Sequence, residues 1–486
     1  MSPDASLLLR PATELAALVR AGEVTAVELT ALALDRIEAV DGHVNAFVDR
    51  WADDALRTAG EIGPGDPRPF AGVPTAMKNN RAVRGRRLTH GSGIVDLVAP
   101  EDHGVTRRVE DAGFVLLGAT NLPEFSITPV TRGRRFGAVR NPWDPGRTAG
   151  GSSGGAAAAV AAGMLPIAHG NDGGGSLRIP AASCGLVGLK PSRGRVTLAP
   201  DLGWHLLATD AMLARTVLDV AAALDVLAGP VPGDLSPLPA VAPGTFAQAA
   251  RRGAAAGPGP LRIALTLDPV FEHEASPGDA AAARATARRL EALGHHVEEV
   301  DAPWRIPGFL DLFTVGFGAG VGAGVRLAGR ARGRDVEAHE VETLTWALYT
   351  QALERPAVDH VIADAEIQGV ARRVLTWAAG YDAVLTPTLA TAPPPVDALD
   401  PDGPDPMGGF RAGAVFSPFA AICNVTGQPA ITLPLGVRPP GDEAAGLPVG
   451  SHLIGRPGGE EGLLELAAQL EADAGAAPVA PSALAG

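Results

Sequence analysis

The stretch from Arg147 to Arg195 reads RTAGGSSGGAAAAVAAG, then MLPIAHGNDGGGSLRIP, then AASCGLVGLKPSRGR. Its glycine density indicates positive φ angles or close approach of the backbone to another group. Three serines lie among these glycines, Ser152, Ser153 and Ser176. A serine nucleophile needs oxyanion-binding N–H groups beside it, so hydroxyls among exposed backbone N–H groups suit acyl transfer.

Apolar runs around these serines predict regular structure and argue against a flexible Gly/Ser linker. Residues 156–165 predict a buried helix, and residues 186–190 a short core strand. Farther along, strands over 261–267 and 296–300 flank a helix over 279–293, a βαβ unit that makes part of the sheet parallel. Further strands are expected near 73–78, 114–120, 381–389, 429–435 and 448–454, and further helices over 12–22, 25–40, 211–227 and 460–472. The pattern is α/β.

The composition excludes several classes of partner. The chain has 486 residues, of which 46% are hydrophobic, so a sizeable core can form. Its 54 acidic and 40 basic residues give a net charge of -14, which disfavours binding to nucleic acids or anionic membranes. No apolar run is long enough for a bilayer span, and the N-terminal segment does not resemble a signal peptide. We therefore expect a cytoplasmic protein that binds neither nucleic acid nor membrane.

The chain has 2 cysteines, Cys184 and Cys423, both in apolar contexts. Two distant cysteines provide neither a disulfide framework nor a CxxC metal site, so buried free thiols are expected. We expect no metal and no organic cofactor.

Four motifs, in order along the chain, resemble the amidase signature family of serine hydrolases. They are the lysine that follows G-V-P, Lys78, then G-G-S-S-G-G at 150–155, D-x-G-G-S-x-R-x-P at 172–180 and C-G-x-x-G-x-K-P at 184–191. The resemblance covers nearly the whole chain, and the motif wording is most similar to stand-alone bacterial amidases of the nylon-oligomer hydrolase type. It implies a large central mixed β-sheet with helices on both faces.

The resemblance and the element pattern together predict one domain over 1–474. Its core comprises roughly 60–228, 255–302 and 380–472, with a surface connection over 229–260. Residues 305–378 are expected to form a helical cover on the substrate side, interrupted by a glycine-rich break at 316–324, and residues 475–486 a flexible tail.

The resemblance also implies roles for individual residues in amide hydrolysis. Ser176 resembles the nucleophile that forms the acyl-enzyme, Ser152 the bridging serine that follows a cis peptide bond, and Lys78 the base. Burial would keep Lys78 partly neutral, because desolvation disfavours the ammonium form, and Ser152 would relay the proton. The oxyanion hole would consist of the N–H groups of Gly173, Gly174, Gly175 and Ser176.

Three further residues are expected to support the catalytic residues. Ser153 would do so by hydrogen bonding to Ser152 or Lys78, and Asp172 with Arg178 as a charge pair that braces the loop.

Two positions depart from the family pattern. Asn79 stands where an aspartate is usual, which removes a charge beside Lys78 or a structural contact, and Gly173 stands where Thr or Ile is frequent.

Two alternatives remain open at this point. Residues 151–155 also match G-x-S-x-G, which would make Ser153 the nucleophile of an esterase or other α/β-hydrolase, although no strand is predicted before it. The chain could also be a catalytically inactive or partner-dependent amidase-like subunit. The retention of Lys78, Ser152 and Ser176 argues against this alternative.

The expected substrate is a small, neutral or apolar amide, because phenylalanines such as Phe313 and Phe317 occur in the cover. The resemblance makes a homodimer possible.

Overall fold

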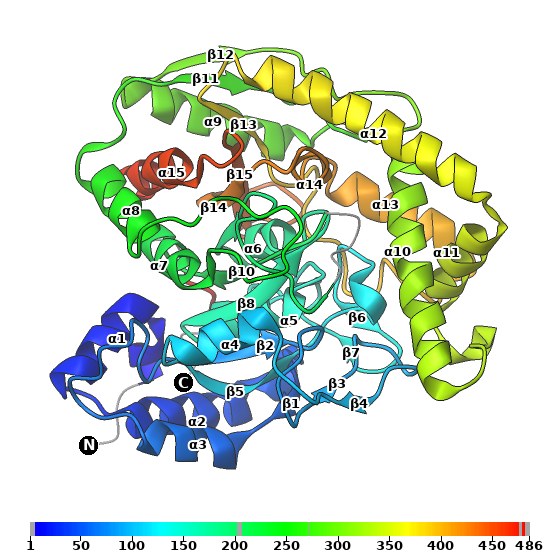
Figure 1. Ribbon diagram of the computed structural model, residues 1–486. Coiled ribbons are helices and arrows are strands. Elements are labelled where there is room, and N and C mark those ends of the chain that lie inside the picture. Colours follow the sequence, from blue (N-terminus) through cyan, green and yellow to red (C-terminus); the bar gives the residue numbers. More distant parts are fainter. Residues whose placement is uncertain (1–4, 202–206, 272, 476–478, 482–486) are drawn as a thin grey trace.

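The computed structural model describes residues 5–201, 207–271, 273–475 and 479–481. Within them the largest sheet has eight strands in the order β12-β11-β13-β15-β14-β9-β10-β8 (Figure 1). β11 is parallel to β12 and β13, and the other pairs are antiparallel, so the sheet is mixed, as expected. The strands are β8 (Ile167–Asp172), β9 (Val187–Lys190), β10 (Thr209–Ala214), β11 (Arg262–Leu265), β12 (His296–Glu299), β13 (Ala383–Pro387), β14 (Ala430–Val437) and β15 (Pro448–Ile454).

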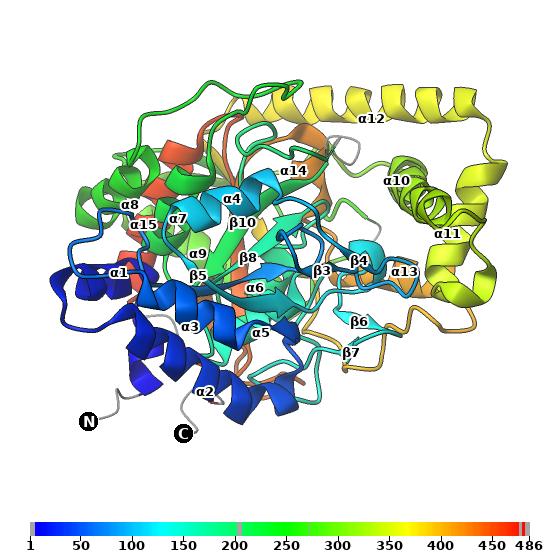
Figure 2. The ribbon, with the colours of Figure 1, turned by 60° about the horizontal axis from the view of Figure 1, so that its bottom comes forward.

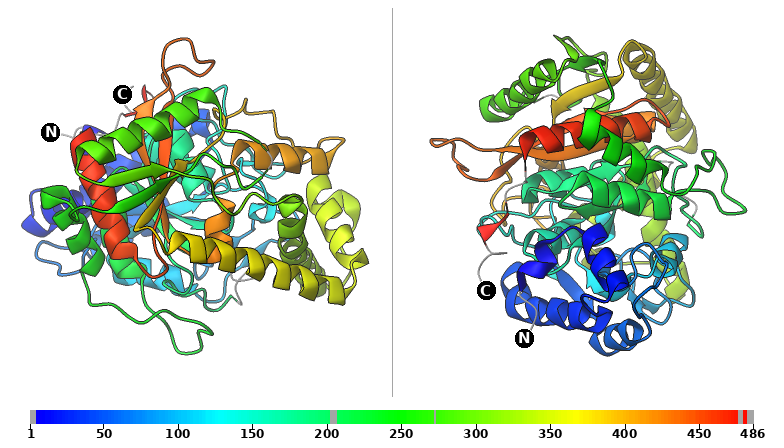
Figure 3. Two further views of the ribbon diagram at one scale, coloured as in Figure 1. Left: turned by 90° about the horizontal axis from the view of Figure 1, so that it is seen from above. Right: turned by 90° about the vertical axis from the view of Figure 1, so that its left-hand side faces the viewer.

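Helices cover both faces of this sheet, which confirms the predicted fold class. Successive side chains of a strand point to opposite faces, so Leu385 of β13 joins one hydrophobic core and Val384 the other. The first core also contains residues of α5, α6, α7, α8, α9 and α15, several of which Figure 3 shows together. These helices are α5 (Gly154–Ala161), α6 (Arg178–Cys184), α7 (Val217–Leu227), α8 (Thr245–Ala256), α9 (Pro277–Ala292) and α15 (Glu460–Ala474).

A second sheet carries Lys78. It has the order β1-β5-β2, from β1 (Phe47–Arg50), β5 (Val115–Thr120) and β2 (Pro74–Lys78). The Thr75 hydroxyl donates to the Ile167 carbonyl of β8, so β2 is tied to the larger sheet. Four helices lie in the same N-terminal part of the chain: α1 (Ala12–Ala21), α2 (Ala26–Val44), α3 (Ala52–Gly60) and α4 (Gly104–Asp111). The remaining strands of the described residues form two short pairs. These are β3 (Arg87–Leu88) with β4 (Leu97–Val98), and β6 (Arg132–Gly133) with β7 (Gly137–Ala138).

The cover consists of long helices, as Figure 2 shows: α10 (Phe309–Arg332), α11 (Thr343–Glu354), α12 (Ala357–Ala378) and α13 (Pro406–Phe416), with α14 (Ala421–Thr426) beneath them. The predicted glycine-rich break at 316–324 was wrong, because α10 is continuous. Gly322 faces α11, where a methyl group in its place would lie 3.3 Å from Ala352 Cβ. Glycine is used here for close helix packing, which a propensity argument alone does not recognise.

Helix α10 also departs from the expectation that no segment is long enough to cross a membrane. By length and composition alone it would suffice, with a mean hydropathy of 1.3 over its apolar window. In the structure 44% of that window is buried, and Phe313, Phe317 and Val321 pack into the second core.

Two other expectations were wrong. The predicted helix over 211–227 is a strand followed by a helix, because β10 pairs with β8 and β9 and α7 begins only after Thr216, whose hydroxyl accepts from Asp219 N–H. The predicted surface connection over 229–260 contains helix α8, whose Phe246 is buried. Helix α2 begins with a capping box, in which the Thr25 side chain accepts from the Glu28 N–H and the Glu28 side chain accepts from the Thr25 N–H. Most of the predicted tail, 475–486, falls outside the described residues.

Candidate active site

Lys78 is the last residue of β2, and its side chain is fully buried. Its Nζ lies 2.7 Å from Ser152 Oγ, 3.1 Å from Ser153 Oγ and 2.7 Å from Asn171 Oδ1. Burial and, secondarily, the nearby Arg81 guanidinium place the pKa of Lys78 well below its usual value, although Asp210 and Asp172 act in the opposite direction. This environment favours a neutral amine.

The hydrogen bonds around Lys78 fix which way its protons point. Asn171 Oδ1 can only accept, and the Ser153 hydroxyl already donates to the Asn171 carbonyl at 3.2 Å, so it too accepts from Lys78. A neutral amine has two N–H groups, and these two acceptors use both. In this neutral form the lone pair of Lys78 is directed at Ser152 Oγ, 2.7 Å away.

A buried chain of polar groups holds the backbone of Lys78. The Lys78 N–H donates to His169 Nδ1 at 3.3 Å, and His169 Nε2 lies 3.1 Å from Asp210 Oδ1. Burial lowers the pKa of His169, so the ring is neutral with its proton on Nε2. Asp210 in turn receives hydrogen bonds from Arg81 at 2.9 and 3.0 Å. The sequence reasoning missed this chain, since its members come from three distant segments.

Ser152 and Ser153 lie at the start of α5, and the Gly151–Ser152 peptide bond is cis, as the resemblance implies. Both serines are fully buried by relative exposure, but only Ser152 lines the cavity described below. Ser153 is enclosed by its bonds to Asn171 and Lys78. This position leaves no access for a substrate carbonyl and disfavours Ser153 as a nucleophile.

The loop from Asp172 to Ser176 connects β8 to α6. Asp172 accepts hydrogen bonds from the N–H groups of Gly175, at 2.7 Å, and Leu177, and forms a fully buried ion pair with Arg178 at 2.9 Å. Burial would raise the pKa of Asp172, but Arg178 holds it below the usual range. Gly173, Gly174 and Ser176 line the cavity. The N–H of Gly175, one of the four predicted oxyanion donors, is instead directed at Asp172.

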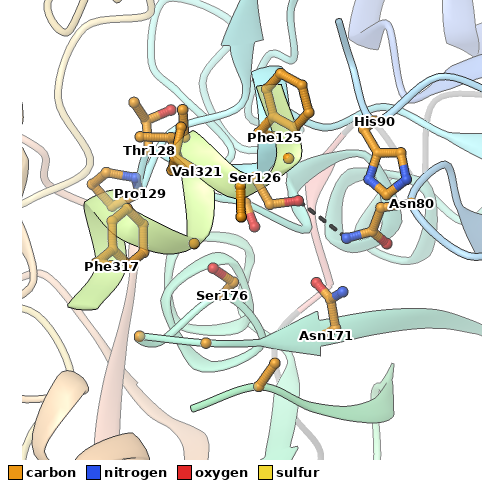
Figure 4. A pocket seen from close by; sticks show the side chains of 18 of the residues that line it. Asn80, His90, Phe125, Ser126, Thr128, Pro129, Asn171, Ser176, Phe317 and Val321 are labelled. Atoms are coloured by element: carbon orange, nitrogen blue, oxygen red, sulfur yellow. Dashed lines mark hydrogen bonds between the residues drawn. The ribbon is translucent and has the colours of Figure 1, made fainter. Parts of the chain in front are cut away.

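A cavity of about 910 Å³ opens above Ser176 (Figure 4). One wall is apolar and comes from α10 and α13, with Phe313, Phe317 and Val321 among its residues. The lining also includes the polar residues Asn80, His90, Ser126 and Thr128. Figure 4 shows Asn80 and His90 on the side away from Phe317, and Thr128 on the side of Phe317. The charged pair on the lining, Arg81 with Asp201, is joined at 2.9 Å. The cavity thus presents mostly neutral surface.

Asn79, the departure from the family pattern, points away from Lys78 Nζ. Its Oδ1 accepts from the Thr89 N–H and hydroxyl, and its Nδ2 donates to the Arg87 carbonyl at 3.0 Å. An aspartate could not make the last bond. Asn79 therefore holds the loop that contains His90. Among the described residues, no cluster of His, Cys, Asp or Glu could hold a metal ion.

Comparisons with known proteins agree with this geometry. The family model described as Amidase matches residues 28–464. The chain is 36% identical to the 6-aminohexanoate-cyclic-dimer hydrolase of Paenarthrobacter ureafaciens, over 96% of this chain and 94% of that protein. A solved structure of 6-aminohexanoate cyclic dimer hydrolase with substrate superposes with a TM-score of 0.90 at 34% identity, covering 98% of this chain and 99% of that one.

A bacterial aryl acylamidase of the amidase signature family superposes with a TM-score of 0.83 at 27% identity, covering 95% of this chain and 96% of that chain. None of these comparisons supports the inactive-subunit or esterase alternatives. The chain belongs to the amidase signature family and is a hydrolase of amide C–N bonds.

Proposed function

We propose that this amidase cleaves its substrate through an acyl-enzyme on Ser176, with Ser152 and Lys78 as the proton relay. The observation that carries the proposal is the 2.7 Å contact of the buried Lys78 Nζ with Ser152 Oγ. A serine hydroxyl is a weak nucleophile and needs a base. Lysine can be that base only when neutral, which burial favours.

In the first step, Ser176 Oγ bonds to the amide carbonyl carbon. Its proton moves to Ser152 Oγ while the Ser152 proton moves to Lys78 Nζ, so charge does not build up on the bridging serine. The carbonyl oxygen becomes an oxyanion, and the N–H groups of Gly173, Gly174 and Ser176 would stabilise it. Each such donor contributes about 3 kcal/mol in other serine hydrolases.

In the second step, the C–N bond breaks and the proton returns from Lys78 through Ser152 to the leaving nitrogen. A water molecule then attacks the acyl carbon while its proton passes through Ser152 to Lys78. The bond between the acyl carbon and Ser176 Oγ breaks, the proton returns through Ser152 to Ser176, and the carboxylic acid leaves as its carboxylate. Asp172 and Arg178 brace the oxyanion loop, and Ser153 keeps one N–H of Lys78 occupied, so that its lone pair faces Ser152.

We further propose a small, neutral substrate. The cavity size, its apolar wall and the internal pairing of Arg81 with Asp201 support it, as does similarity to enzymes named for a cyclic amide dimer and for aryl acylamides. Equal turnover of charged and neutral acyl amides would contradict this proposal of a neutral substrate.

We also propose a single domain over residues 1–474, a homodimer and a cytoplasmic location. Two buried free thiols support the cytoplasmic location.

The nucleophile can be tested by intact mass spectrometry after treatment with a fluorophosphonate. We expect one adduct on the wild type and none on a folded Ser176→Ala variant. An adduct that persists in this variant would point to Ser153, and a folded wild type without any adduct would argue for an inactive or partner-dependent subunit.

A further inference from the structure

One side chain of the short helix α14, Asn424, holds the oxyanion loop, residues 172–176, from outside. Asn424 lies 252 residues after Asp172 in the chain and is 1% exposed. Its Nδ2 donates to the main-chain carbonyl of Asp172 at 3.0 Å and to Asp172 Oδ1 at 2.9 Å, and its Oδ1 accepts from Arg178 Nη2 at 2.8 Å. The ion pair that braces the loop therefore has a third member, which none of the four sequence motifs contains.

The orientation of the Asn424 amide follows from the chemistry of its partners. A guanidinium group only donates, so the atom that faces Arg178 must be the amide oxygen. A carbonyl oxygen only accepts, so the amide nitrogen must face the carbonyls of Asp172 and Leu207, each 3.0 Å away. A rotated amide would place like groups against each other at all of these contacts, so the side chain has one orientation.

The contact with the Asp172 carbonyl also sets the direction of the next N–H group. Asp172 O and the Gly173 N–H belong to the same peptide group, which is trans and planar, so they point in opposite directions. With the oxygen held against Asn424, the Gly173 N–H points away from that amide. Gly173 lines the cavity, and no group in the described part of the chain accepts a hydrogen bond from its N–H. This N–H is therefore free to bind a substrate oxygen.

The peptide between Asp172 and Gly173 needs such an external contact. Glycine has no side chain to restrict its backbone, and Gly173 and Gly174 follow one another in the loop. Among the side chains that the structure describes, Asn424 alone donates to the Asp172 carbonyl. Helix α14 is itself fixed by Arg193, which donates to the carbonyls of Asn424 and Val425 at 2.6 and 3.0 Å.

We propose that Asn424 is a positioning residue of the oxyanion hole, which aims the Gly173 N–H at the oxygen of the tetrahedral intermediate. This inference rests on the proposed acyl-enzyme at Ser176 and deepens it. Asn424 is not among the residues that line the cavity, so it acts through the peptide of Gly173 rather than on the substrate. Donors that are already aimed at the developing charge need no reorganisation during the reaction.

A phenylalkyl trifluoromethyl ketone and the carbinol of the same skeleton separate this role from a merely structural one. With the ketone, Ser176 Oγ bonds to the carbonyl carbon, the Ser176 proton passes through Ser152 to Lys78, and the ketone oxygen becomes an oxyanion. The carbinol fills the same cavity but has no carbonyl group and forms no oxyanion. The inhibition constants of both compounds are measured against hydrolysis of one p-nitroanilide, together with kcat and the melting temperature.

Asn424→Ala is expected to lower kcat and the affinity for the ketone by about tenfold to a hundredfold, because the Gly173 donor is no longer held in place. The affinity for the carbinol should change by less than about threefold, since the ground state makes little use of that donor. Equal losses of affinity for ketone and carbinol, or a wild-type kcat in the folded variant, would overturn the proposal.

Gln428→Ala is the matched control. Gln428 is also a buried amide that donates to a main-chain carbonyl, that of Gly455 at 2.8 Å, but this carbonyl lies outside the oxyanion loop. Gln428→Ala should lower the melting temperature while changing the affinities for ketone and carbinol by the same factor. A selective loss of the ketone in this control would show that any weakening of the fold produces the effect, and would overturn the proposal.

Asn424→Ser is the second variant and decides the question if Asn424→Ala does not fold. Its hydroxyl is one bond shorter than the amide nitrogen that it replaces, so the same selective loss of the ketone is expected, and equal losses would overturn the positioning role. The wild type tests the catalytic proposal separately. If it binds the ketone no more tightly than Ser176→Ala does, the nucleophile is wrong. Tight ketone binding by the wild type together with equal losses in the Asn424 variants would contradict the positioning role alone.

Discussion

Lys78 Nζ and Asn171 Oδ1 lie 2.7 Å apart in the buried centre of the site. The amide oxygen is an acceptor without charge, so it orients the amine without stabilising its ammonium form. A carboxylate in the same place would favour the ammonium form. The identity of residue 171 therefore bears on whether Lys78 can act as a base.

Asn171→Asp is expected to raise the pKa of Lys78 and to lower kcat/KM at neutral pH by about a hundredfold, because an ammonium cannot accept the Ser152 proton. The acidic limb of the pH profile of kcat/KM should move to higher pH. Asn171→Ala is the control: it also lowers activity but adds no charge, so it should not move the limb upward. An unmoved limb in Asn171→Asp would contradict the proposed role of Lys78.

The network behind Lys78 predicts unequal effects of two aspartates that share Arg81. Asp210 is fully buried, whereas the side chain of Asp201 is 50% exposed. Asp210→Asn should lower the free energy of unfolding by about 3 kcal/mol, because it leaves the buried guanidinium without its main counter-charge. Asp201→Asn should lower it by less than about 1 kcal/mol. Urea denaturation of both variants measures the difference, and equal losses would show that Asp210 is not the dominant partner.

Sequence patterns could predict the fold class and the candidate triad because both depend on local signals. Lys78, Ser152 and Ser176 are marked by motifs within a few residues of each. Asn171, His169 and Asp210 carry no such mark, since their importance comes from contacts across distant segments.

The errors in the predicted elements have a similar physical origin. Residues 211–214 are apolar enough for either a helix or a buried strand, and pairing with β8 decides between them. Gly318 and Gly322 would weaken an isolated helix, but packing against α11 favours their place in α10. In both cases tertiary contacts outweigh local propensity.

Two buried carboxyl groups at the joint between the cover and the catalytic body predict a pH-dependent stability. Glu342, just before α11, donates its N–H to Glu124 at 2.8 Å. Burial, reinforced by Glu124, raises the pKa of Glu342 to about 8, from a usual value of 4.5. Between these values the folded protein keeps a proton that the unfolded chain has lost, so stability falls as pH rises, by up to about 1.4 kcal/mol per pH unit.

Glu342→Gln should therefore stabilise the protein above about pH 8 and flatten this dependence. Urea midpoints measured at about pH 6 and about pH 9 would show it. Glu354→Gln, at the exposed end of α11, is the matched control and should leave the wild-type dependence intact. A wild-type midpoint that stays constant over this range would contradict the raised pKa of Glu342.

Two neighbouring glycines of the oxyanion loop should respond differently to an added methyl group. Gly175 has φ +128, and its Cβ would lie 2.7 Å from Ala420 Cβ and from Ile179 Cδ1. Gly175→Ala is thus expected to displace the loop, with a loss of activity of at least about a hundredfold and a lower melting temperature.

At Gly174 the nearest atom to an added methyl group would be Phe313 Cζ at 3.7 Å. Gly174→Ala should therefore keep the melting temperature of the wild type while narrowing the cavity beside Ser176. Because its N–H is retained, Gly174→Ala should raise KM for bulky amides more than it lowers kcat for small ones. Equal thermal destabilisation by the two substitutions would mean that the loop is not fixed by the contacts of Gly175.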